Sequence, residues 1–203
     1  MSAEIPQLRK NCTRSHSAPG PGATLDRIVA MDFVLRDARD DDASQLIELI
    51  GACWSEYPGV IMDVDGEVPE LRAIATAYQK RRGRFWVVEK AGRVIGSAGI
   101  AATKDPAVFE LQKLYVAKDA RRQGLGAHLC QVVESEALAR GGKSLELWSD
   151  TRFQDAHRLY EKLGYIRGPQ TRSLNDLSQT VEYYFRKELT RTGPPTSPKK
   201  RSP

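Results

Sequence analysis

The stretch between residues 116 and 129 carries the residue types and spacing that could do chemistry. It reads VAKDARRQGLGAHL, with a strand pattern before it and a helical pattern after it. The first turn of a helix has free backbone N–H groups and the positive end of the helix dipole, which together hold a phosphate or diphosphate. Gly124 and Gly126 would let a phosphate approach the backbone closely, and Arg121 and Arg122 would add positive charge.

Two better-known phosphate motifs do not fit this stretch. A dinucleotide-binding fingerprint needs a third glycine where the chain has Leu129, and a P-loop needs a Gly-Lys-Ser/Thr run that is absent from the sequence. The remaining alternative is a glycine-rich helix start that binds nothing.

Two neighbouring segments make the motif more specific. The preceding strand reads ELQKLYV (residues 110–116), the glycine loop reads RRQGLG (121–126), and a later helix reads DAHRLYEKLGY (155–165). In this order and on these elements, the three segments resemble the general-control-type N-acetyltransferase (GNAT) superfamily. The resemblance extends from about Val34 to Leu189.

The resemblance implies an acetyl-CoA site. The strands Phe109–Val116 and Ser144–Trp148 would run parallel and then splay apart, with acetyl-CoA between them as the co-substrate. The diphosphate would bind backbone N–H groups after the basic loop, and the pantetheine would pair with the first strand. The residues implied are Leu114, Tyr115, Val116, Arg121, Arg122, Gln123, Gly124, Leu125, Gly126 and Ala127.

The resemblance also implies two catalytic residues. Tyr160 has the place of a tyrosine that many members use as general acid, and a phenol can protonate a departing thiolate. Glu110 has the spacing of a glutamate that some members use to deprotonate the attacking amine. The alternatives are a core aromatic for Tyr160, and for Glu110 a surface acid or an ion pair with Lys113 or an arginine. Phe153 departs from the family, since many members have asparagine there in contact with the cofactor.

Strand alternation gives an expectation for the side chains around Glu110. It places Glu110, Gln112 and Leu114 on one face, and the residues between them and Tyr115 on the other. The acceptor site is expected between the first two helices, their loop and the late strands. Its candidate side chains are Asp63, Asp65, Glu67, Trp54, Tyr57 and Trp86, with a solvated acidic loop or ordinary core packing as alternatives.

The elements that must position these residues follow an alternating pattern. Short strands are predicted at residues 33–36, 84–89, 93–100, 108–116, 144–149, 165–167 and 181–188, and helices at about 43–53, 70–82, 124–140 and 153–163. The dipeptide Ala91-Gly92 indicates a tight hairpin. We therefore expect an α/β (α+β) fold: a mixed, mostly antiparallel central sheet flanked by helices, with one splayed parallel strand pair.

Composition bounds the domain organisation. The chain has 203 residues, a length typical of one domain with loose ends. Residues 1–30 mix Ser, Pro, Gly and charge, which predicts a disordered N-terminal arm, and Met31 is a candidate natural start. Residues 191–203 predict a disordered basic C-terminal tail. The N-acetyltransferase domain is expected at residues 31–190.

Charge and cysteine content exclude several classes of protein. The net charge of +5 comes largely from the predicted tails, so we expect no nucleic-acid partner. No apolar run is long enough to span a membrane and no secretory signal is visible, so we expect a cytoplasmic protein without a membrane partner. Three widely spaced cysteines argue against disulfides and a zinc site, and no metal is expected. A homodimer is the default expectation for a soluble enzyme.

These observations predict an enzyme that transfers acetyl from acetyl-CoA directly to a primary amine. Small amines, antibiotics, amino acids, peptide N-termini and protein lysines all stay open as acceptors. The alternative is a non-catalytic acyl-CoA-binding regulatory module on the same fold.

Overall fold

The computed structural model describes residues 33–190, so the predicted N-terminal arm and C-terminal tail lie outside the described residues. The strands are β1 (Val34–Asp37), β2 (Arg84–Lys90), β3 (Arg93–Ala102), β4 (Val108–Val116), β5 (Ser144–Asp150), β6 (Ile166–Ser173) and β7 (Val181–Glu188). The α-helices are α2 (Ala43–Trp54), α3 (Ile74–Lys80), α4 (Leu125–Ala139) and α5 (Gln154–Lys162).

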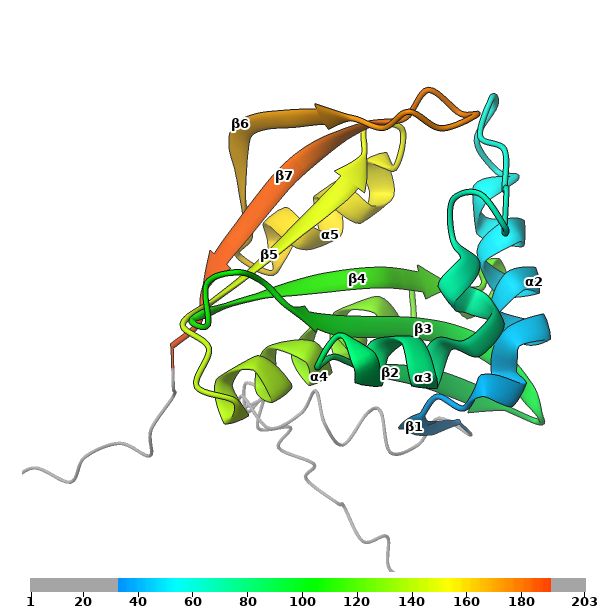
Figure 1. The fold of residues 1–203 in the computed structure, drawn as a ribbon, viewed down its shortest axis with the longest axis horizontal. Helices are drawn as coiled ribbons and strands as arrows, with labels where there is room; N and C mark the ends of the chain where they lie inside the picture. The colour runs from blue at the N-terminus through cyan, green and yellow to red at the C-terminus, as the bar shows by residue number, and fades with distance from the viewer. Residues whose placement is uncertain (1–32, 191–203) are drawn as a thin grey trace, which may run out of the picture. The chain divides into compact units, whose positions relative to one another are not determined.

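The strands form one seven-stranded sheet with the order β1-β2-β3-β4-β5-β7-β6 (Figure 1). Neighbouring strands in this part of the chain are antiparallel except for β4 and β5, which run parallel. The predicted fold class, with its mixed and mostly antiparallel sheet, is therefore confirmed.

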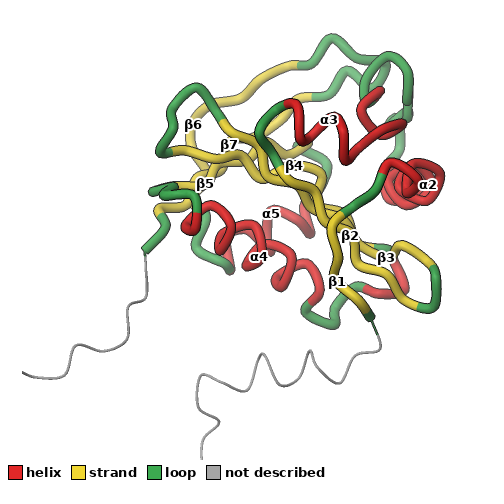
Figure 2. The backbone as a smooth tube through the Cα atoms, turned by 60° about the horizontal axis from the view of Figure 1, so that its bottom comes forward, coloured by secondary structure: helices red, strands yellow, loops and turns green. Residues whose placement is uncertain are grey.

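Helices cover both faces of the sheet. Figure 2 shows α4 and α5 on one face and α2 and α3 on the other. The long helix α4 buries an apolar stripe at helical spacing, which packs against β3 and β4. That stripe is Leu125, Leu129, Cys130, Val133 and Ala137. None of the helices within residues 33–190 is long and apolar enough to cross a membrane.

The turn between β2 and β3 has the predicted hairpin chemistry. Ala91 and Gly92 both have positive φ, 48° and 77°, and Lys90 pairs with Arg93 across the turn. Two successive positive φ angles define the turn whose twist matches that of the flanking strands.

Two predicted elements differ from the structure. The second helix was predicted over residues 70–82, but Pro69–Ala73 forms a 3₁₀ turn and α3 spans only Ile74–Lys80. The cause is Ala73, whose extended φ of −151° separates the two pieces. Strand β6 was predicted to end at residue 167 and continues to Ser173. It is an exposed edge strand, where an apolar alternation is not required.

The parallel pair at the centre of the sheet separates after a short contact. Strand β4 pairs with β5 only over Val108–Glu110 and Ser144–Glu146, and the two strands then diverge (Figure 1). The rest of β4 keeps β3 on one edge and has no strand on its other edge. This open edge is where the resemblance places the pantetheine.

A β-bulge in β4 makes the predicted alternation wrong beyond Gln112. Gln112 pairs with Gly99 and Tyr115 with Ser97, so one strand has an additional residue between these pairs. Lys113 accommodates it with a left-handed φ of 51°, and its carbonyl accepts the Ser97 hydroxyl at 2.9 Å. As a result Lys113 and Tyr115 share a face with Glu110, and Leu114 turns to the opposite face.

Candidate active site

A cleft of about 510 Å³, here called the helix cleft, lies between the end of β4, the start of α4 and helix α5. It brings together the predicted cofactor-binding residues with the exception of Gln123, whose side-chain amide donates to the Asp119 carbonyl. The structure therefore assembles in one place a set of residues that was predicted from a single contiguous segment.

The first turn of α4 leaves backbone donors in this cleft. The first helical hydrogen bond is donated by His128 to the Gly124 carbonyl, at 3.0 Å. The N–H groups of Leu125, Gly126 and Ala127 consequently have no partner within the helix. Gly124 has a φ of 86° with open space where a side chain would lie, which suits a closely approaching anion.

The second glycine also brings two helices together. A Cβ on Gly126 would lie 3.0 Å from the Leu159 Cδ2 atom. The small size of Gly126 therefore allows α4 to approach α5, while the residue still lines the helix cleft.

The two arginines of the loop differ in their ion-pair and hydrogen-bond partners. Arg121 is engaged by Glu56 through bonds of 2.9 and 2.6 Å and donates its Nε–H to the Val116 carbonyl at 2.9 Å. Arg122 is exposed and has a left-handed φ of 60°. Lys162 on α5 also lines the cleft. Arg122 and Lys162 thus supply cationic side chains that have no ion-pair partner among residues 33–190, in contrast to Arg121.

The backbone at Val116 faces the gap between the diverging strands. Ala117 donates its N–H to the Ile95 carbonyl of β3 at 2.9 Å, so strand alternation turns the Val116 peptide groups away from β3. The Val116 carbonyl is occupied by Arg121 and by the Cys53 thiol at 3.5 Å. Its N–H is the group that remains available to a bound molecule.

A second cleft of about 450 Å³, here called the loop cleft, lies on the other face of β4. Tyr115 and Phe153 line both clefts. Phe153 packs against Tyr57 with ring centroids 4.7 Å apart, so an aromatic contact replaces the polar contact that the resemblance would give this position. The two clefts therefore adjoin at the place where β4 and β5 separate.

Glu110 lines the loop cleft and is half-buried there. Burial raises the pKa of its carboxyl; the Gln112 amide and Arg172 oppose this shift, while Glu146 and Glu182 add to it. The carboxyl has no ion-pair partner among the described residues, and the predicted pairing alternative with Lys113 does not occur because that ammonium binds Glu70 at 2.8 Å. A carboxyl with a raised pKa is a stronger base than an ordinary one, which suits it to accept a proton.

The remaining acceptor candidates divide between the clefts and the core. Glu67 and Trp54 line the loop cleft, and Tyr57 lines the helix cleft. Asp65 pairs with exposed Arg72, Asp63 caps the turn at Gly66, and Trp86 lies in the core.

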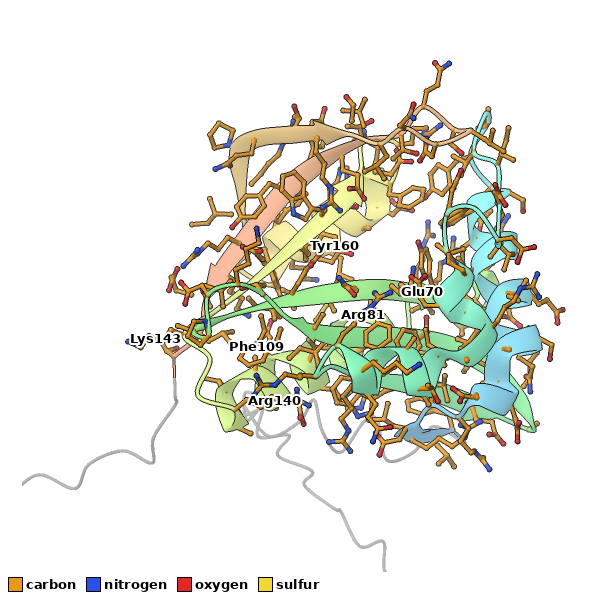
Figure 3. The ribbon with its side chains drawn as sticks, in the orientation of Figure 1. Glu70, Arg81, Phe109, Arg140, Lys143 and Tyr160 are labelled. Atoms are coloured by element: carbon orange, nitrogen blue, oxygen red, sulfur yellow. The ribbon has the colours of Figure 1, made fainter. Side chains whose placement is uncertain are left out.

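Tyr160 projects from α5 beside the gap between β4 and β5 (Figure 3). Its ring packs against Tyr165 and Phe185 at 5.8 and 5.6 Å, and burial raises the pKa of its phenol well above the ordinary value. The Tyr115 hydroxyl, which accepts the Trp54 indole N–H at 2.8 Å, also acts on this pKa and so lies nearby. The phenol therefore stays protonated, and Tyr160 is not among the residues that line either cleft.

Sequence reasoning missed the residues that α5 and the late loop contribute. Asp155, Ala156, Leu159, Lys162 and Leu163 line the helix cleft, and their helical spacing is a signal that could have identified this face. Asp176 and Glu182 line the loop cleft without a comparable sequence signal. His157 packs against Tyr183 and Phe185, and Cys130 is buried with a pKa raised to about 12 by burial. Within residues 33–190, no three His, Cys, Asp or Glu side chains are grouped as a metal ion would require.

Solved structures share this fold. An acetyltransferase from Streptococcus agalactiae superposes with a TM-score of 0.67 at 19% identity, over 78% of this chain and 99% of that one. The structure of yncA, a putative acetyltransferase from Salmonella typhimurium solved with its cofactor acetyl-CoA, has a TM-score of 0.61 at 18% identity, over 81% and 98%.

Curated relatives match at higher identity. The uncharacterized N-acetyltransferase YjgM of Escherichia coli is 29% identical over 70% of this chain and 86% of its own length. The probable N-acetyltransferase camello of Xenopus tropicalis is 35% identical over 60% of this chain and 58% of its own length. The chain thus spans little more than half of the length of this vertebrate relative. A sequence model of the acetyltransferase (GNAT) family matches residues 43–165, and the chain belongs to that family.

Proposed function

We propose that the protein transfers the acetyl group of acetyl-CoA directly to a primary amine, with the donor in the helix cleft and the amine in the loop cleft. The observation that carries this proposal is the junction of the two clefts at Tyr115 and Phe153, beside the gap between β4 and β5. A donor and an acceptor that enter from opposite faces of the sheet would meet there, which supplies the proximity that a direct transfer needs.

The helix cleft has the chemistry that acetyl-CoA requires. The unpaired N–H groups of the first turn of α4, with Arg122 and Lys162 beside them, suit the diphosphate. Leu114, Leu159 and Leu163 offer apolar contacts for the pantetheine. The presence of acetyl-CoA in the Salmonella typhimurium neighbour supports this use of the fold.

Glu110, Val116 and Tyr160 can divide the reaction between them. Glu110 would take a proton from the ammonium group, so that the nitrogen can bond to the acetyl carbon as the carbon–sulfur bond breaks. The Val116 N–H would donate to the acetyl oxygen while negative charge develops on it. Tyr160 would give its proton to the departing sulfur. The second proton that the nitrogen loses as it becomes an amide, and the proton held by Glu110, would pass to solvent, which would also reprotonate Tyr160.

The raised pKa of Tyr160 is compatible with this role. A phenol whose pKa lies far above its ordinary value protonates an ordinary thiolate poorly. The same surroundings, however, raise thiol pKa values, as burial does to about 12 for the neighbouring Cys130. A thiolate that departs into this environment would likewise be a stronger base, so the donor and acceptor stay matched.

The test is acetyl-CoA binding by calorimetry together with free-thiol release across a panel of amines. Binding with amine-dependent thiol release supports the transferase. Binding without thiol release for any amine would favour the non-catalytic acyl-CoA-binding module. Absence of binding at millimolar coenzyme A would refute both.

A further inference from the structure

We propose that the acceptor is a small diamine, with its reacting amine at Glu110 and its second cationic group between Glu67 and Asp176. This inference rests on the proposed function, because it names the class of molecule that enters the loop cleft. It follows from how that cleft is closed and from where its unpaired charges lie.

A strap closes one end of the loop cleft. We use this name for the two loops 57–67 and 174–180, which hydrogen-bond to each other although they are far apart in sequence. Ile61 donates its N–H to the Ser178 hydroxyl at 2.8 Å, and that hydroxyl donates to the Ile61 carbonyl at 3.1 Å. Leu177 donates its N–H to Glu67 at 3.1 Å. Figure 1 shows these loops meeting at the end of the gap bounded by β4 and β5.

The strap limits the size of the acceptor. Residues of both loops line the cleft, including Val60, Glu67, Asp176 and Ser178. The space of about 450 Å³ is thus framed by two strands and two joined loops. A small molecule fits such a frame, while a lysine on the surface of a folded protein would need the strap to open.

Most charges in the cleft neutralise one another. Glu70 binds Lys113 at 2.8 Å, and Glu182 is paired with Arg172. Asp150 binds Arg152 at 2.7 Å. The further cationic side chain in the lining is Arg81, which is exposed and lies near Glu70 on the α3 side, as Figure 3 shows. The basic side chains that line the cleft therefore lie beside Glu70 and Glu182.

Three carboxyls in the lining have no ion-pair partner within residues 33–190: Glu67, Glu110 and Asp176. Asp176 accepts the Thr180 N–H at 2.8 Å, and the nearby Arg152 guanidinium is bound by Asp150. Burial raises the pKa of Glu67, and the charges of Asp176 and Asp63 add to the shift. Glu67 and Asp176, which belong to different loops and carry like charges, thus lie near each other in the strap. Glu110 lies elsewhere in the cleft, separate from this pair.

Because the unpaired carboxyls lie in two separate places, the cleft favours a molecule that carries two cationic groups. A monoamine at Glu110 leaves the carboxyls of the strap opposed to each other and unpaired. A diamine supplies a counter-charge to both places at once, and a charged hydrogen bond contributes more than a neutral one.

The experiment compares diamines of three to eight carbons with amino alcohols of the same length. In each pair a neutral hydroxyl replaces the second ammonium and little else changes. We expect kcat/KM for the best diamine to exceed that of its amino alcohol by about tenfold or more. Calorimetry with the diamine alone should detect binding that the amino alcohol lacks.

Three variants assign the effect to the strap. Glu67→Gln and Asp176→Asn should each lower kcat/KM for the diamine by about tenfold and so reduce its advantage over the amino alcohol. Asp65→Asn is the matched control, because Asp65 pairs with exposed Arg72 and should leave both acceptors unaffected.

The outcomes separate this inference from the proposed function. If diamine and amino alcohol react equally, or if a lysine peptide reacts faster than either, the diamine assignment is wrong while acetyl transfer stands. If no amine reacts and no diamine binds, the diamine assignment is also wrong. Acetyl-CoA binding then distinguishes a non-catalytic acyl-CoA-binding module from a protein that does not bind acetyl-CoA.

Discussion

The two clefts beside β4 are built in different ways. The helix cleft takes much of its lining from one continuous segment, β4 through the start of α4, and offers backbone N–H groups to its ligand. The loop cleft takes its lining from segments scattered between Trp54 and Glu182 and offers mainly side chains. A site made from contiguous backbone has a recognisable sequence pattern, whereas a site made from distant side chains acquires its character only in the folded chain.

The clefts also differ in charge. The helix cleft presents the N-terminus of α4 with Arg122 and Lys162, all suited to an anion. The loop cleft has an excess of carboxyls, suited to a cation. The two substrates proposed above are therefore directed to different faces, and variants in each cleft should affect different kinetic constants.

Glu110→Gln should have the largest effect, because it removes the proposed base. We expect kcat to fall by about 10²- to 10⁴-fold with acetyl-CoA affinity unchanged. In the unmodified protein the base works only when ionised, so kcat/KM should be lost as pH falls through the raised pKa of Glu110. The pH profile of kcat/KM measures this limb, and Glu161→Gln on the exposed side of α5 is the control.

The same variant should stabilise the protein. Since the folded state holds the Glu110 proton more tightly than the unfolded state, stability should decrease as pH rises from the ordinary carboxyl pKa through the raised one. Glu110→Gln should abolish this decrease and raise the melting temperature at neutral pH. A melting temperature that drops in the variant would contradict the buried, unpaired state of this carboxyl.

Tyr160→Phe should have the next largest effect. Loss of the phenol proton is expected to lower kcat by about 10²-fold, while calorimetry should find acetyl-CoA affinity nearly intact. Tyr165→Phe is the matched control, because that ring packs against Tyr160 at 5.8 Å and should leave kcat unchanged. Equal kcat values for the two variants would indicate that Tyr160 only packs in the core.

Gly124→Ala should weaken the helix cleft selectively. A side chain at a φ of 86° costs about 1 kcal/mol, and a shift of the loop to relieve this strain would move the N–H groups of the first turn. We expect acetyl-CoA affinity to fall about tenfold with the acceptor KM unchanged. Gly126→Ala, which meets Leu159 instead of open space, should change affinity less and alter thermal stability by at most about 1 kcal/mol.

Glu56→Gln should have the smallest effect. It releases Arg121 from its ion pair, which is partly exposed and so contributes under about 1 kcal/mol to stability. The freed guanidinium should increase acetyl-CoA affinity a few-fold at low salt, and added salt should remove the gain. Unchanged affinity at every salt concentration would mean that Arg121 serves only to hold the end of α2.

Much of the frame could be predicted from local patterns. Ala91-Gly92 identifies the hairpin because Gly92 adopts positive φ without strain, and the apolar spacing from Leu125 to Ala137 identifies α4. These are short-range effects, so the sequence alone contains them.

Other features depend on contacts between distant segments. The bulge at Lys113 requires β3 opposite β4 and the buried carboxylate of Glu70, and neither is visible in the strand itself. Arg121 resembles a free phosphate ligand until Glu56 is placed beside it. The strap, likewise, joins Ile61 to Ser178 and has no local signature.

The use of backbone donors at Val116 and at the start of α4 has a consequence for inheritance. Exchanging one side chain for another leaves a peptide N–H in place, and only proline removes it. Mutational drift in a lineage can therefore alter the amine that is accepted, by changing residues of the two loops, while the groups that hold the donor persist. A new acceptor can arise in such a lineage without any loss of the older binding capacity.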